Sequence, residues 1–134
     1  MAQEWFPHDY IPYRLGRDFD KEPWTPDQPR LTGVAQTSFE IGLLTEDNLP
    51  SYHREVDRAF GRESAWGFWV NRWTAEEGRH AFCIRDYLLV TRAVDPVALE
   101  RGRMCQVSTG QVPAPVSAHD GLVYLTLQEL ATRI

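Results

Sequence analysis

The sequence predicts an all-α fold built as one domain. Three observations favour this class: apolar residues recur at three- and four-residue spacing along most of the chain, no alternating strand pattern of useful length occurs, and proline or glycine marks the breaks between periodic segments. The 134 residues are 43% hydrophobic and 25% charged, which suits a single buried core rather than two.

The first element is an arm over residues 1–30, expected to be ordered and to lie over the core. Five of the nine prolines fall in it and exclude a regular helix there. Large aromatic rings alternate with these prolines and offer surface to bury. They are Trp5, Phe6, Tyr10, Tyr13, Phe19 and Trp24. The helical bundle is then expected to occupy residues 31–134.

Five helices are expected in that bundle, and sequence signals mark several of their boundaries. Pro50 ends or kinks the first, Ser64 is a candidate N-cap for the third, and Asp95 followed by Pro96 fits the opening of the fourth. The fifth follows a loop that contains one glycine and two prolines. The expected helices run over residues 31–48, 49–60, 65–92, 96–107 and 118–134.

Charge and composition exclude several classes of function. The net charge is −5, from 14 basic and 19 acidic residues that do not form blocks, which argues against a nucleic-acid partner. No apolar stretch approaches the roughly 18 residues of a membrane span, and the start of the chain lacks a signal-peptide pattern, so we expect a cytoplasmic location. Cys83 and Cys105 lack metal-binding spacing and are expected to be free, buried thiols.

The longest predicted helix carries an acid and a histidine on its apolar face. Glu77 and His80 continue the apolar stripe and are both expected to be buried. Their i, i+3 spacing is the E-x-x-H arrangement that binds iron or manganese inside helix bundles. Glu76 projects off the stripe and is expected to be an exposed partner of Arg79 or Arg72. The stripe itself consists of Trp66, Trp69, Val70, Trp73, Ile84, Tyr87 and Leu88.

Two further helices place an acid on their apolar stripes. Glu46 lies in register with Phe39 and Gly42 on the first helix, and Glu129 lies in register with Leu122 and Leu125 on the last. A buried carboxylate without a partner costs several kcal/mol. Three such acids, on three helices, therefore favour a shared cation, which is the basis for predicting a metal site.

Each of these residues also has an interpretation without a metal. A single E-x-x-H occurs by chance in many solvated helices. Glu46 can cap or pair at the end of its helix before Pro50, and Glu129 can form a surface pair with Arg133 at i+4. The metal hypothesis depends on all of these acids being interior together.

Several long motifs, in the same order, resemble those of the soluble acyl-acyl carrier protein desaturases, and of their actinobacterial branch most of all. The motifs cover residues 5–12 (W-x-P-x-D-Y-I-P), 44–53 (L-T-E-D-N-L-P-S-Y-H), 69–80 (W-V-N-R-W-T-A-E-E-G-R-H), 86–96 (D-Y-L-L-V-T-R-A-V-D-P) and 127–134 (L-Q-E-L-A-T-R-I). These desaturases are ferritin-like di-iron enzymes of fatty-acid biosynthesis. The resemblance therefore implies a ferritin-like helical bundle.

The resemblance also implies a role for each candidate metal ligand. Glu46 matches a terminal carboxylate of one iron, and His80 matches the imidazole on that same iron. Glu77 matches a carboxylate that bridges the two irons, and Glu129 matches the terminal carboxylate of the other iron. By this resemblance the cofactor is a di-iron centre.

Two further residues and the partners are implied in the same way. Thr132 matches a threonine that handles reduced oxygen species, and Trp5 matches an outer tryptophan linked toward the iron-binding histidine, where electrons are proposed to enter. The implied reaction uses O2 to introduce a double bond into an acyl chain carried on acyl carrier protein. A ferredoxin-type donor supplies electrons, and the chain is expected to form a homodimer. Arginines are expected to dock the acidic carrier.

The sequence departs from the family pattern in two respects. Gly78 stands where the family usually has asparagine, and it puts a helix-weakening residue in the metal-binding turn, at a cost of roughly 1 kcal/mol relative to alanine. Only four of six expected ligands are present, because the second E-x-x-H of the family lies in helices beyond this sequence. The bundle is therefore expected to be incomplete, and three hypotheses follow: a truncated desaturase, an inactive desaturase-like interaction subunit, and a homodimer in which each copy contributes Glu46, Glu77 and His80.

Overall fold

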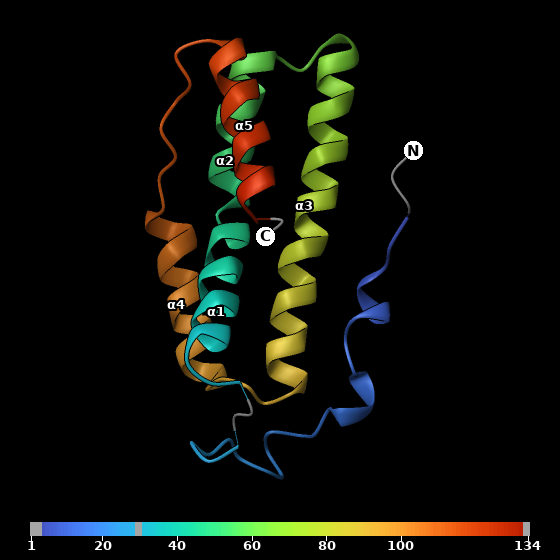
Figure 1. Cartoon of the computed structure of the whole chain (residues 1–134), viewed down its shortest axis with the longest axis vertical. Helices are drawn as coiled ribbons and strands as arrows, with labels where there is room; N and C mark the ends of the chain where they lie inside the picture. Colours follow the sequence, from blue (N-terminus) through green and yellow to red (C-terminus); the bar gives the residue numbers. More distant parts are fainter. Residues whose placement is uncertain (1–3, 29–30, 133–134) are drawn as a thin grey trace.

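The computed structural model describes residues 4–28 and 31–132, and the elements among them are all helices, which confirms the predicted fold class (Figure 1). It is consistent with a ferritin-like helical bundle. The helices are α1 (Val34–Asp47), α2 (Leu49–Phe60), α3 (Ser64–Val90), α4 (Pro96–Thr109) and α5 (Ala118–Thr132), preceded by the short 3-10 turns η1 (Pro7–Asp9) and η2 (Tyr13–Leu15). Residues 133 and 134 of the expected last helix lie outside the described part of the chain.

Helices α1 and α2 form one column that is interrupted at Asn48, and the long helix α3 runs beside both (Figure 1). Helix α4 packs against α1, and α5 packs against α2. The interruption arises because Pro50 occupies the first turn of α2, where its missing N–H is tolerated. The long helix α3 therefore runs along two shorter helices, α1 and α2, which lie end to end. A candidate site near the junction of α1 and α2 can draw on all three helices.

The expected boundaries are mostly correct, with local differences that have physical causes. Helix α1 begins at Val34 instead of residue 31, because Gly33 adopts a positive φ of 56°. The N-cap of α3 is Glu63, and Ser64, expected to be that cap, is the first residue of the helix. Helix α3 ends two residues before Arg92, whose φ of 56° lies in the left-handed region that ends helices.

The predicted N-cap of α4 is confirmed. Asp95 accepts hydrogen bonds from the backbone N–H groups of Val97 at 2.9 Å and Ala98 at 3.3 Å. Pro96 follows it as the first residue of the helix, as expected. The helix continues to Thr109, two residues beyond its expected end.

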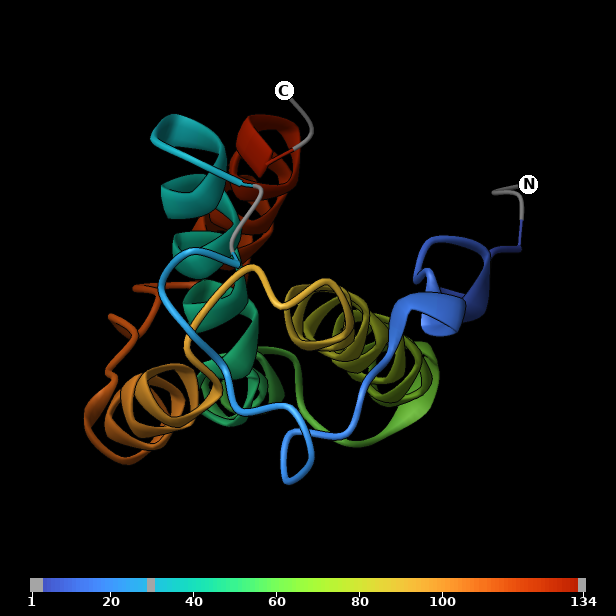
Figure 2. The same cartoon turned by 90° about the horizontal axis from the view of Figure 1, so that it is seen from below.

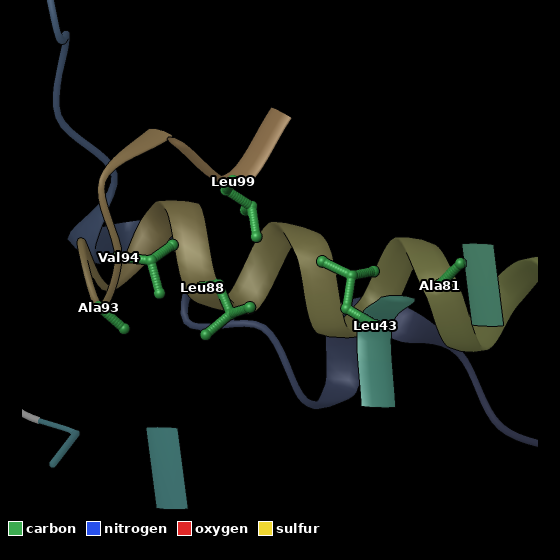
Figure 3. Packing of buried hydrophobic residues seen from close by; sticks show 6 residues of the cluster. All are labelled: Leu43, Ala81, Leu88, Ala93, Val94 and Leu99. Atoms are coloured by element: carbon green, nitrogen blue, oxygen red, sulfur yellow. The ribbon is translucent and has the colours of Figure 1, made fainter. Parts of the chain in front are cut away.

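Two apolar clusters hold the helices together. The larger joins α1, α3 and α4 and contains Leu43, Ala81, Leu88, Ala93, Val94 and Leu99 (Figure 3). The smaller joins α2, α3 and α5 and contains Val56, Val70 and Leu125. The predicted stripe of α3 is thus largely confirmed, but Trp66 is 44% exposed. It lies in the first turn of α3, where it stacks on Phe60.

The cysteines are free within the described residues, as expected, but the prediction that both are buried is wrong. Cys83 is half-buried and Cys105 is exposed. Helix α4 packs on α1 through residues such as Leu99, and Cys105 lies on a part of α4 that this contact does not cover.

The part of the N-terminal segment that contains η1 lies beside α3, on the side away from α4 (Figure 2). Farther along the segment, Trp24 and Pro26 line a pocket together with Leu99 of α4. Arg92 anchors the segment: this side chain is 1% exposed, donates from Nε to Gln28 Oε1 at 2.7 Å and also donates to the carbonyl of Glu22. The Arg92 guanidinium lies 4.2 Å from the ring centroid of Phe19, and the Trp24 indole N–H donates to the backbone carbonyl of Arg92 at 3.2 Å. The division into an arm (1–30) and a bundle (31–134) stays a prediction. Over residues 4–28 and 31–132, no helix has both the length and the apolar character needed to cross a membrane.

Candidate metal centre

The centre of the candidate site is one turn of α3. Glu77 and His80 face the same way at i, i+3 spacing, and a Glu77 carboxylate oxygen lies 3.1 Å from His80 Nδ1. Glu77 is 8% exposed, which confirms the prediction that it is buried. The His80 side chain is 32% exposed, so the expectation that it is buried is wrong. This side chain lines an open cavity between α3, α1 and α5.

Glu46, in the last turn of α1, faces this pair. Its Oε1 lies 3.8 Å from His80 Nδ1, and donor atoms of Glu46, Glu77 and His80 all lie within 4.8 Å of one another. The packing of α1 on α3 brings them together, with the fully buried Leu43 of α1 in the apolar cluster that joins these helices. The group could hold a metal ion.

The two carboxylates determine the charge of the imidazole. Ion pairing with Glu46 and Glu77 raises the pKa of His80 from 6.5 to about 10. In the metal-free molecule at neutral pH, His80 is therefore protonated and acts as the counter-ion of the carboxylates. A metal ligand must be a neutral imidazole, so a cation entering this group would displace that proton.

Glu129 and Thr132, both on α5, are placed differently from the other candidate residues. The prediction that Glu129 is buried is wrong, because its side chain is exposed. It nevertheless lines an open cavity of about 830 Å³ together with Glu46 and His80. Partial burial and then the negative charge of Glu77 raise its pKa above the usual glutamate value. The backbone of Thr132 ends α5, and its side chain lies outside the described part of the chain.

The residue beside Glu46 holds a structural role that sequence reasoning missed. Asp47 accepts two hydrogen bonds from Arg103 on α4, at 2.5 Å from Nε and 2.8 Å from Nη2. Arg103 also donates to Glu100 at 2.9 Å, and these acids raise the pKa of its guanidinium. The bidentate pair fixes the end of α1 against α4. Because 56 residues separate the partners, no local pattern indicates it.

Trp5 covers the imidazole from outside. Its ring is stacked on His80 with centroids 5.5 Å apart and planes inclined by 29°. Its indole N–H donates to Glu76 at 2.6 Å. Glu76 pairs with Arg79 and Arg72, as expected, but the prediction that it is exposed is wrong, since 30% of its side chain is accessible. The arm covers it, and that contact could not be read from the helix alone.

Comparison with known proteins decides the family. A family model described as fatty acid desaturase matches residues 1–134, the whole sequence. The chain belongs to the fatty acid desaturase family. The resemblance inferred from the motifs is thereby confirmed.

Several curated relatives of this desaturase-family chain carry desaturase names. DesA1 of Mycobacterium tuberculosis, provisionally named as an acyl-[acyl-carrier-protein] desaturase, is 49% identical over 145 residues that cover 100% of this chain and 43% of DesA1. DesA2 of the same organism is 41% identical over 93% of this chain and 46% of its own length. Stearoyl-[acyl-carrier-protein] 9-desaturase 6 of Arabidopsis thaliana is 36% identical over 67% of this chain and 25% of its own length.

The desaturase-family chain therefore spans less than half the length of these curated relatives. No solved structure matches it.

Proposed function

We propose that this chain carries part of the di-iron centre of an acyl-acyl carrier protein desaturase. The observation that carries the proposal is the convergence of Glu46, Glu77 and His80 from two helices. Two carboxylates and one imidazole fit iron by donor chemistry, and E-x-x-H turns facing a further glutamate are the pattern of di-iron helix bundles. The family and the names of its relatives support acyl carrier protein bearing a fatty acyl chain as the substrate.

Each residue then has a stated task. Glu46, Glu77 and His80 would hold the metal from α1 and α3, and Glu129 would contribute a further carboxylate from α5. A di-iron centre, when bound, supplies the O2-dependent oxidation that turns a single C–C bond of an acyl chain into a double bond. Thr132 lies one helical turn beyond Glu129 and would handle protons and reduced oxygen species there.

The remaining parts of the proposal concern partners. Electrons would come from a ferredoxin-type donor, and Trp5, stacked on His80, would be the group through which they enter. The enzyme would act as a cytoplasmic homodimer. Arginines on its surface would dock the acidic carrier protein despite the net charge of −5.

A second candidate function is a metal-binding homodimer that rebuilds the centre across a twofold axis. The open cavity beside Glu46 and His80 favours it, because a second copy could approach there with its own three donors. Glu129 would then be surplus. The interaction-subunit hypothesis requires no metal at all.

Iron content per chain, measured after anaerobic loading with Fe(II), tests these proposals together with the mass in solution. Glu77→Gln should abolish iron binding. Glu55→Gln is the matched control, because Glu55 is similarly buried at 7% exposure but pairs with Arg54 and Arg58 on α2 instead. Iron retained in the control and lost in the Glu77 variant supports the metal site.

The stoichiometry separates the two metal hypotheses. Two irons per dimer, lost in Glu77→Gln together with the dimer, support the site across two copies. Iron that is lost in Glu77→Gln while the dimer persists supports a site carried by each chain by itself. A dimer that binds no iron in either form favours the interaction subunit. Negligible iron in the unmodified chain would refute metal binding by these 134 residues.

A further inference from the structure

Three contacts hold Trp5 against α3. Its indole N–H donates to Glu76 at 2.6 Å, its backbone carbonyl accepts from Arg79 Nη1 at 2.8 Å, and the Arg79 guanidinium lies 4.9 Å from its ring centroid. Glu76 and Arg79 also pair with each other. The two side chains thus form a clamp, which we call the Glu76–Arg79 clamp, on the turn that carries Glu77 and His80.

We propose that the Glu76–Arg79 clamp docks Trp5 on His80 and thereby holds the imidazole in the orientation that binds metal. Neither clamp residue is a candidate metal ligand, so both are positioning residues that act through Trp5. The inference rests on the proposed metal site for its consequence. Its first step, docking of the indole by Glu76, does not depend on any metal.

The geometry explains how the clamp reaches His80. One face of the imidazole is covered by the Trp5 ring, while its Nδ1 is directed to Glu77 at 3.1 Å. A ring that is held on one face and at one edge has little freedom to rotate about χ2. The His80 side chain is otherwise 32% exposed and lines an open cavity. The Trp5 ring of the arm therefore restrains an imidazole that is otherwise partly exposed.

The clamp has a quantitative consequence for metal binding. Residues that orient a metal ligand from outside typically change affinity by tenfold or more, so loss of the clamp should weaken Fe(II) binding about tenfold. The coupling is reciprocal, since metal binding must then strengthen the docking of Trp5 by the same factor.

Indole N–H signals of the full metal-free chain test the first step. The sequence has five tryptophans, and the Trp5 signal is the one absent in Trp5→Phe. Its short, charge-assisted hydrogen bond should place this signal downfield, and Glu76→Gln should move it upfield. Arg72→Gln is the matched control. It removes another group near the Glu76 carboxylate, at 3.9 Å, but keeps the carboxylate that accepts the hydrogen bond from Trp5. An unmoved signal in Glu76→Gln would overturn the docking step.

Fe(II) affinity measured by anaerobic equilibrium dialysis tests the second step. Glu76→Gln and Trp5→Phe should each weaken binding about tenfold, and the double variant should bind no more weakly than either single one. Additive losses would mean that Glu76 acts by its charge alone and would overturn positioning through Trp5. If the unmodified chain binds no Fe(II), the proposed metal site and the affinity step both fail, while the indole signal still decides the docking step.

Discussion

Replacing Asp47 with asparagine should lower the free energy of unfolding by about 3 kcal/mol. The Asp47 side chain is 6% exposed and that of Arg103 is 18% exposed, so the bidentate pair is largely withdrawn from water. Removal of one partner from a buried ion pair costs about 3–5 kcal/mol, because the other charge is left without compensation. The lower end applies here, since Arg103 keeps Glu100 and the asparagine keeps one acceptor oxygen.

Urea unfolding followed by circular dichroism at the helical band measures this cost, provided that the slope of the transition is unchanged. Glu100→Gln is the matched control. It also removes an acid from Arg103, but 43% of the Glu100 side chain is exposed, so its loss should cost at most about 1 kcal/mol. If Asp47→Asn costs no more than this control, the argument from burial is refuted.

Two further predictions concern His80 and two glycines of the helices. In the metal-free chain, the raised pKa of His80 contributes stability that is fully present below pH 6.5 and is lost as the pH rises through about 10. The urea midpoint of the unmodified chain should therefore fall toward that of His80→Gln across this window, and parallel curves would contradict the ion pair. Gly67→Ala should cost about 2 kcal/mol, because its Cβ would overlap the backbone of Arg62, whereas Gly102→Ala in open space on α4 should raise stability by up to about 1 kcal/mol. Thermal midpoints that shift in the same direction would exclude this difference in packing.

The sequence predicts helices well where the signals are local. The expected bounds of α2 coincide with the structure, because Pro50 suits the first turn and Gly61 follows the last residue with a φ of 77°. The Asp95 cap is correct for the same reason. Ser64 shows the limit, since a serine at a break suggests a cap although the preceding glutamate holds that position.

Burial is predicted less well, because it depends on which partner covers each face of a helix. Glu77 and Glu129 occupy equivalent positions on apolar stripes, but Glu77 is buried where α1 packs on α3, whereas Glu129 is exposed beside an open cavity. Glu76 shows the opposite error, because the arm covers it. The partners Trp5 and Glu76 are 71 residues apart, and neither helical periodicity nor composition indicates such a contact.

Residues of α3 and of the turn after it anchor the N-terminal segment. During synthesis the segment therefore emerges well before the residues that it contacts. Trp5 contacts Arg79 across 74 residues, and Gln28 contacts Arg92 across 64. At about 5–20 residues per second, a ribosome needs roughly 4–15 s to synthesise the chain between Trp5 and its partners. The aromatic rings of the segment are therefore made first and docked late. During that interval they are exposed surface, available to chaperones or to one another, and α3 must form before they are buried.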